Sequence, residues 1–114
     1  MKHNALEMTL LLDYYGELLT EKQKTCFDLY YNQDLSLGEI AEEAGISRQG
    51  VHDSLARAEA ALLEFEQKLG CLSRARRQSE AAARITRAAH ALQALPQAAE
   101  LAGNILDAVR ELKE

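Results

Sequence analysis

The chain has 114 residues, of which 47% are hydrophobic and 27% charged, and it contains one Pro and no Trp. This composition is that of a globular, helix-rich protein, and it excludes a disordered chain or a repeat array. No stretch is long and apolar enough to span a membrane, and residues 1–4 lead into a helical pattern without a signal-peptide core. We therefore expect a cytoplasmic protein without membrane insertion.

Charge is divided unequally along the chain. The formal net charge is −5, but residues 1–70 carry 6 Lys or Arg against 13 Asp or Glu, whereas residues 71–114 carry 7 against 5. Neutralisation of phosphates supplies most of the non-specific affinity of proteins for DNA. An acidic N-terminal part is therefore poorly suited to bind duplex DNA tightly.

Two amphipathic helices are predicted first, at about residues 5–15 and 21–31. Leu and Tyr residues recur at helical spacing in the first helix, and Gly16 is expected to close it. The second helix begins with a capping box, in which the Thr20 hydroxyl accepts from the first turn and the Gln23 side chain reaches back.

The stretch at 39–55 predicts a helix-turn-helix motif. Ser36 and Glu39 repeat the capping-box pattern and start a short helix, which Gly45 ends because a residue without a Cβ adopts the left-handed conformation at low cost. Ser47 is expected to cap the second helix. Small or apolar residues fill the positions where the two helices cross and pack on the body: Ala41, Ile46 and Val51.

The second helix of this motif turns a mixed set of polar side chains outward. Arg48 and Gln49 are suited to read base edges, and the helix N-terminus favours phosphate. Asp53 and Glu59 add repulsion, and Gly50 costs the helix up to about 1 kcal/mol relative to Ala. A solvated or protein-contacting surface explains this face about equally well. The candidate nucleic-acid-binding residues are Ser47, Arg48, Gln49, His52 and Arg57.

A long helix is predicted from Ser47 to about Leu69. Its apolar residues recur at spacings of 4-3-4-3-4, and about 23 helical residues span roughly 35 Å. A compact domain with three other helices cannot cover this length. The half from Leu62 onward should therefore pack on the C-terminal segment or on a second chain, and we predict a homodimer formed through residues 62–69 and the last helix.

Gly70 is the predicted boundary between a domain at 1–70 and a helical segment at 71–114. An Ala-rich helix is expected at about residues 73–95, Pro96 breaks it, and a last amphipathic helix follows. Four residues of the Ala-rich helix form an apolar stripe: Ala82, Ile85, Ala89 and Leu92.

Beside that stripe, the Ala-rich helix carries a basic face. Arginine makes bidentate contacts with phosphate, so the face is suited to bind RNA backbone or an acidic protein. A solvated helix side that pairs with Glu residues of the first domain explains it about equally well. The basic face consists of Arg74, Arg76, Arg77, Arg84 and Arg87.

The sequence contains no motif for catalysis, metal binding or cofactor binding. A Walker loop, a G-x-S-x-G elbow and an H-E-x-x-H helix are all missing. Cys26 and Cys71 have no Cys or His partner at metal spacing, so we expect two buried free thiols. His52 and His90 are isolated, and the paired tyrosines are expected in the core. We predict no enzymatic activity, no metal and no cofactor.

Five segments of the first domain resemble the YlxM family of small bacterial helix-turn-helix proteins. The likeness covers residues 6–69, whereas Gly50 and the chain from Gly70 onward depart from the pattern or lie outside it. The segments are LLDYYG at 11–16, LTEKQ at 19–23, LYY at 29–31, DLSLGEIAEE at 34–43 and SRQ at 47–49.

This resemblance implies an all-α fold like the promoter-reading region 4 of sigma factors, in the winged-helix-like class of DNA-binding domains. Members of the family are associated with the signal recognition particle, whose GTPase Ffh and small RNA deliver nascent membrane proteins. The resemblance therefore implies a cytosolic accessory or regulator of the particle, without enzymatic activity, that binds Ffh or its RNA through the basic face and Arg48. The alternatives are a pure oligomeric scaffold and a transcriptional regulator that reads DNA with Arg48, Gln49 and His52.

Overall fold

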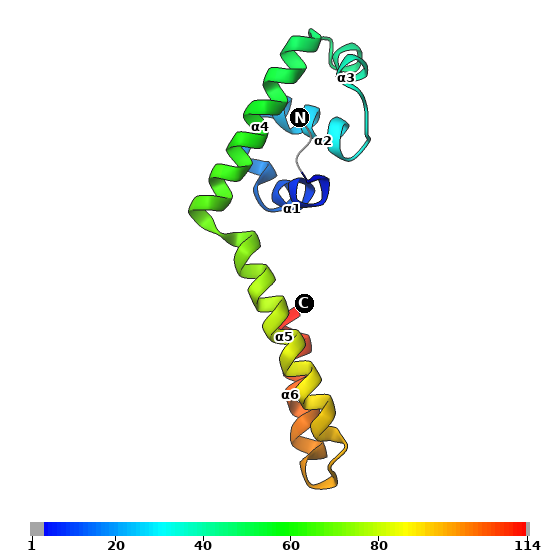
Figure 1. Ribbon diagram of the computed structural model, residues 1–114, viewed down its shortest axis with the longest axis vertical. Coiled ribbons are helices and arrows are strands. Elements are labelled where there is room, and N and C mark those ends of the chain that lie inside the picture. Colours follow the sequence, from blue (N-terminus) through cyan, green and yellow to red (C-terminus); the bar gives the residue numbers. More distant parts are fainter. Residues whose placement is uncertain (1–3, 114) are drawn as a thin grey trace. The chain divides into compact units, whose positions relative to one another are not determined.

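The computed structural model describes residues 4–113, and within that range the chain is helical apart from short turns, with no strand (Figure 1). This confirms the predicted all-α fold. Residues 1–3, where no signal peptide is expected, and residue 114, where the second domain is predicted to end, lie outside the described residues. The α-helices are α1 (Ala5–Tyr15), α2 (Glu21–Tyr31), α3 (Leu37–Ala44), α4 (Arg48–Leu69), α5 (Cys71–Gln93) and α6 (Ala99–Lys113).

The chain divides into two compact units between Leu72 and Ser73. Unit 1 contains α1 to α4 and the first two residues of α5, and unit 2 contains the rest of α5 together with α6. None of the described helices is long and apolar enough to cross a membrane.

The core of unit 1 forms where α4 packs against the three helices that precede it. The apolar stripe of α4 points inward, and Val51, Leu55 and Leu62 are each 0% exposed. Full burial of a side chain of this size stabilises a fold by about 1.5–3 kcal/mol. The large side chains that meet the stripe from α1, α2 and α3 are Met8, Leu11, Tyr15, Phe27 and Ile40.

Local capping signals set the starts of α2 and α3 as predicted. The amide of Gln23 donates to Thr20 Oγ1 and the amide of Thr20 donates to Gln23 Oε1, both at 3.1 Å. At α3, the amide of Glu39 donates to Ser36 Oγ at 3.1 Å, and the amide of Ser36 donates to Glu39 Oε1 at 2.9 Å. The hydrogen bonds from Ser36 hold the pKa of the Glu39 carboxyl below its ordinary value.

Glycines end both helices of the helix-turn-helix, α3 and α4. Gly45 ends α3 with a φ of 70° and Gly70 ends α4 with a φ of 65°, the left-handed conformation that glycine adopts at low cost. Gly16 differs, because its φ is −56° and the chain passes from α1 into a short 3-10 turn, Gly16–Leu18. The angle between α3 and α4 is therefore set by one left-handed residue and the turn that follows it.

The second half of α4 does not need the partner that its length suggested. Leu62 is fully buried within unit 1, and the Phe65 ring packs on the Tyr15 ring with centroids 5.9 Å apart. The argument from helix length is therefore wrong for Leu62 and Phe65, because α1 lies along this part of α4 and covers it. The homodimer through residues 62–69 and the last helix stays a prediction. On this part of α4, Leu63 and Leu69 remain exposed, at 41% and 51%.

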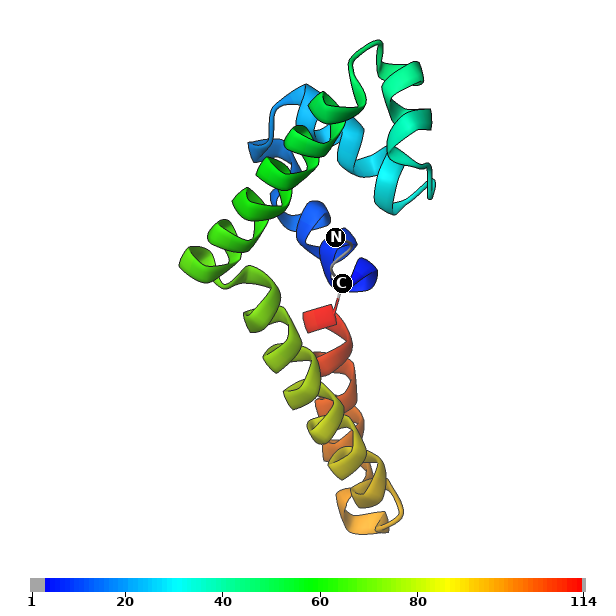
Figure 2. The same ribbon diagram turned by 45° about the horizontal axis from the view of Figure 1, so that its top comes forward.

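Unit 2 is a pair of antiparallel helices, α5 and α6, which run side by side in both ribbon views (Figure 2). The chain reverses at the 3-10 turn Pro96–Ala98, where Pro96 was predicted to break the helix. The two helices meet mainly through small side chains, because the buried residues of the seam are Ala82, Ala89, Ala102 and Val109.

The predicted apolar stripe of α5 is therefore only half buried. Ala82 and Ala89 lie in the seam with α6, but Ile85 and Leu92 are 43% and 40% exposed. The apolar stripe of α5 is wider than the surface that a single antiparallel helix covers. The larger side chains of the stripe are therefore left exposed within unit 2.

Candidate nucleic-acid interface

Two cationic surfaces are candidates for binding a nucleic acid. One is the outward face of α4 in the helix-turn-helix element, and the other is the basic face of α5 in unit 2. They lie in different compact units, so each is described separately.

The N-terminal turn of α4 is shaped by Ser47. The Gly50 amide donates to Ser47 Oγ at 2.9 Å, as the predicted cap requires. A Cβ on Gly50 would lie 3.1 Å from that oxygen and 3.7 Å from Ile46 Cδ1. The glycine that looked costly for the helix thus leaves room for the cap and for the turn residue behind it.

Three of the predicted reading residues lie together on one exposed face. Arg48, Gln49 and His52 line a shallow depression with Leu37 of α3. Arg57 is also exposed, but it comes nine residues after Arg48 and therefore lies about half a turn around the axis of α4, away from this depression. Base-reading side chains of a helix-turn-helix occupy this part of the second helix. The structure thus brings Arg48, Gln49 and His52 together, with Ser47 exposed just before them, and leaves Arg57 apart.

Asp53 places a negative charge on this surface, which makes it less suited to bind phosphate. Gln49 Nε2 donates to Asp53 Oδ1 at 3.0 Å, and His52 Nδ1 lies 3.5 Å from the same oxygen. The hydrogen bond from Gln49, followed by that from His52, holds the pKa of the Asp53 carboxyl below its ordinary value. Asp53 therefore stays ionised at neutral pH, and two of the predicted reading residues are oriented toward a carboxylate. The exposed Glu42 and Glu43 on α3 add further negative charge.

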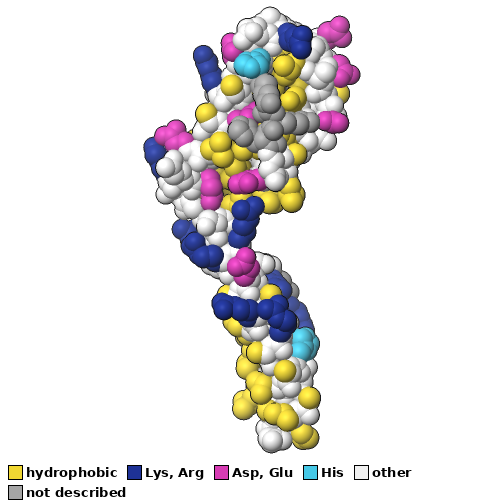
Figure 3. All heavy atoms as spheres, viewed as in Figure 1, with side chains coloured by type: hydrophobic (Ala, Val, Ile, Leu, Met, Phe, Trp, Pro, Cys, Tyr) yellow, Lys and Arg dark blue, Asp and Glu magenta, His cyan; other side chains and the backbone are white. Residues whose placement is uncertain are grey.

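The basic face of α5 has the opposite character. All five arginines are exposed, and Arg77 Nη1 donates to Ser73 Oγ at 3.2 Å. Within the described part of unit 2, Arg76, Arg84 and Arg87 form no ion pair with its acidic residues. Arg77 and Arg84 are seven residues apart and Arg76 and Arg87 eleven, so whole numbers of turns keep the four within about 100° around the axis. In Figure 3, Lys and Arg side chains gather over the first half of α5.

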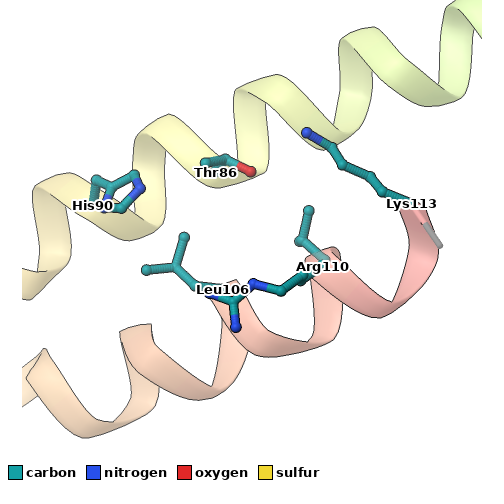
Figure 4. Close-up of a pocket in the computed structure, with 6 residues that line it drawn as sticks. Thr86, His90, Leu106, Arg110 and Lys113 are labelled. Carbon is teal, nitrogen blue, oxygen red and sulfur yellow. The ribbon is translucent and has the colours of Figure 1, made fainter.

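The packing of α6 adds cationic residues that the sequence analysis did not assign to this surface. Thr86 and His90 of α5 face Arg110 and Lys113 of α6 across a cleft of about 190 Å³, whose floor includes Leu106 and Val109 (Figure 4). Arg110 Nη1 lies 3.4 Å from Asp107 Oδ1. Arg87 is next to Thr86 and about 60° from His90 around the helix axis, so the basic face of α5 borders this cleft. Two separate helices contribute to the cleft, and sequence periodicity does not say which of their faces meet.

The potential metal ligands and the two thiols were also placed by the structure. No group of three His, Cys, Asp or Glu side chains within residues 4–113 is placed to hold a metal ion. Cys26 is buried, as expected for a structural thiol, whereas Cys71 is only part-buried, which corrects the prediction of two buried thiols.

Fold and surface together define a helix-turn-helix protein whose recognition element is followed by a basic helical hairpin. The model of the family described as "Putative helix-turn-helix protein, YlxM / p13 like" matches residues 2–101, and the chain belongs to this family, UPF0122.

Relatives in the same family match this chain over different lengths. The UPF0122 proteins of Desulforamulus reducens and Thermoanaerobacter sp. are 53% and 57% identical over 74 residues, which cover 65% of this chain and 63% of each relative. The UPF0122 protein of Shouchella clausii is 41% identical over 112 residues, which cover 98% of this chain and 99% of that protein. The first two alignments thus span less than two thirds of the relatives' length.

Proposed function

We propose that this protein is an accessory component of the bacterial signal recognition particle pathway that binds the particle's RNA, with Ffh as the other candidate partner. The observation that carries the proposal is the separation of charge. The cations that could bind phosphate are concentrated on α5 and at the α6 cleft. On the helix-turn-helix face, by contrast, Gln49 donates a hydrogen bond to the carboxylate of Asp53. The membership in the YlxM-like family supports the choice of partner through the resemblance described above.

Arginine at this spacing suits a phosphate backbone. Each guanidinium can make two parallel hydrogen bonds to one phosphate, and its charge cannot be lost by deprotonation. Four of the arginines point within about 100° of one another, so they can follow one stretch of backbone while His90, Arg110 and Lys113 flank it at the cleft. Such a contact releases counterions and is strongly salt-dependent.

Neutralising part of the basic face is expected to weaken RNA binding. In the variant Arg84→Gln with Arg87→Gln, loss of two phosphate contacts should lower the slope of log K against log salt by about 1.4–1.8, at about 0.7–0.9 per contact. Fluorescence anisotropy with labelled particle RNA at several salt concentrations measures this slope. The matched control, Lys22→Gln with Lys68→Gln, removes two exposed cations of unit 1 and should leave the slope unchanged.

Purified Ffh is titrated in the same assay. If the arginine variant binds RNA like the wild type but loses Ffh, the protein partner replaces the RNA in the proposal. If neither RNA nor Ffh binds the wild type, or both still bind the arginine variant unchanged, the proposed role of the basic face is wrong.

A second candidate function is sequence-specific DNA binding, and it is favoured by the exposed Arg48 and Gln49 at the N-terminal turn of α4. In that case Arg48→Ala should cost about 1–3 kcal/mol on the preferred duplex and relax its specificity. Arg57→Ala, about two and a half turns later on the same helix, should weaken all duplexes uniformly. Electrophoretic mobility shifts with specific and scrambled duplexes separate the two results. Binding that is weak and independent of sequence would contradict this second function.

A further inference from the structure

Unit 2 leaves an extensive apolar surface uncovered. Six large aliphatic side chains of the hairpin are between 38% and 78% exposed, five on its two helices and Leu95 in the turn between them. Figure 3 shows hydrophobic side chains gathered along this part of the chain. We name them the outer apolar face: Ile85, Leu92 and Leu95 from the α5 side, and Leu101, Ile105 and Leu112 from α6.

These residues lie on one side of the hairpin. On α5, Ile85 and Leu92 each come three residues after a buried alanine of the seam, and on α6 Ile105 and Leu112 each come three residues after a buried seam residue. A local two-fold axis normal to the plane of the hairpin relates two antiparallel helices. Residues at the same offset from the seam therefore point to the same side of both.

The spacing indicates what covers the face. Ala88 completes a 3-4-3 series from Ile85 to Leu95, and Ala108 completes a 4-3-4 series from Leu101 to Leu112. This heptad-like pattern is typical of a seam that packs against further helices. The hairpin's own seam contains three alanines and one valine, so little apolar area is buried within unit 2 itself. A second layer of helices would supply the missing core.

We propose that the occupant is a second copy of this chain, and that two hairpins join through their outer apolar faces as a four-helix bundle. The face contains no charged residue among its members, so two copies can approach without repulsion. The cleft cations Arg110 and Lys113 lie around the opposite groove, away from this contact. Identical surfaces close a two-fold dimer without leaving an edge for further assembly.

The size of the face determines how tight such a dimer can be. Each apolar row is about ten residues long, roughly 16 Å, and two adjacent helices are roughly 20 Å wide. The face is thus about 300 Å² per copy, the size of the largest apolar patch of a typical monomer, which is often functional. A standard interface buries about 800 Å² per partner, so this dimer should be a weak one that dissociates on dilution.

Sedimentation velocity of the full chain over a concentration series tests the proposal. The average mass should rise with concentration toward that of two chains. Leu101→Glu with Leu112→Glu changes the two most exposed members of the face, at 67% and 78%. Because a charge buried without a partner is costly, the dissociation constant should rise at least about 100-fold. The milder Leu101→Ala with Leu112→Ala keeps strong helix formers and should raise it about 10-fold.

The control is Leu63→Glu, a 41% exposed leucine on α4 within the segment first expected to dimerise. It should leave the dissociation constant unchanged, and circular dichroism should report the wild-type helix content for each variant. A wild-type chain that stays monomeric throughout the series overturns the proposal. So does a dimer that survives both substitutions of Leu101 and Leu112, or one that Leu63→Glu weakens as much. None of these results depends on RNA binding.

Discussion

Replacing Leu62 by Ala is expected to lower the free energy of unfolding by about 2–5 kcal/mol, the usual cost of truncating a fully buried leucine. Leu62 is 0% exposed inside unit 1, because α1 covers the second half of α4. The neighbouring Leu63 is 41% exposed, so Leu63→Ala should cost less than about 1 kcal/mol. Denaturant titration of the two variants compares the same chemical change at adjacent positions.

The effect of Leu62→Ala should also be independent of protein concentration. A residue that is buried by its own unit loses the same contacts in a monomer and in a dimer, whereas an interface residue would matter more when the chains associate. Equal losses for both leucines, or a loss for Leu62→Ala that grows with concentration, would restore the dimer contact that the sequence suggested for this helix.

The second large effect concerns the junction between α4 and α5. The Tyr15 hydroxyl donates to Glu66 Oε1 at 2.7 Å and accepts from the Cys71 amide at 3.0 Å. The Leu72 amide donates to the same Glu66 oxygen at 3.0 Å. The first amides of a helix have no partner within the helix. Side chains from α1 and α4 therefore cap the start of α5.

Tyr15→Phe keeps the ring that packs on Phe65 but removes both hydrogen bonds of the hydroxyl. The Cys71 amide then loses its acceptor. A buried polar group without a partner costs about 1–3 kcal/mol, and Cys71 is part-buried, so we expect the lower end of that range. The free energy of unfolding should fall by an amount in that range. Amide hydrogen exchange should locate the change, because protection should fall at Cys71 and remain in the middle of α4.

Because the Tyr15 hydroxyl can ionise, the same contact should make the free energy of unfolding fall at alkaline pH. Burial, followed by the hydrogen bonds with Cys71 and Glu66, raises the pKa of the Tyr15 hydroxyl well above its ordinary value. A pKa raised on folding stabilises the native state fully below the ordinary tyrosine pKa, and this contribution is lost as pH rises toward the folded pKa. The phenolate absorbance of Tyr15 should therefore appear only well above the ordinary pKa of tyrosine. Early ionisation of Tyr15, identified by its loss in Tyr15→Phe, would contradict this contact.

A dimer through the outer apolar face has a consequence for the proposed function. Each copy would contribute one basic face, because neither the α6 cleft nor the arginines of α5 belong to the outer apolar face. Two such faces on one assembly engage an extended RNA with higher avidity than one. The arginine variant and the leucine variant should thus weaken RNA binding by different routes, one through the salt slope and the other through protein concentration.

Much of the fold was predictable because its signals are local. Thr20 with Gln23 and Ser36 with Glu39 satisfy helix amides three residues away, and Gly45 supplies the left-handed turn within one residue. Such interactions need no knowledge of the rest of the chain. The helix-turn-helix element and the exposure of its reading residues follow from them. The pairing of Gln49 with Asp53 is local too, since the two are four residues apart, but several rotamers compete for that contact.

By itself, then, the sequence determined the all-α class, the helix-turn-helix element, the starts of α2, α3 and α4, and the separation of an acidic N-terminal part from an arginine-rich helix. The tertiary structure alone decided which apolar residues are covered. Periodicity marks Leu62 and Ile85 as equally apolar, yet α1 buries the first, and α6 leaves the second exposed. Tertiary packing also formed the hydrogen bond between Tyr15 and Glu66, which are 51 positions apart, and placed Arg110 in the cleft that Thr86 also lines. These contacts depend on how whole helices pack, and no local pattern encodes which faces meet.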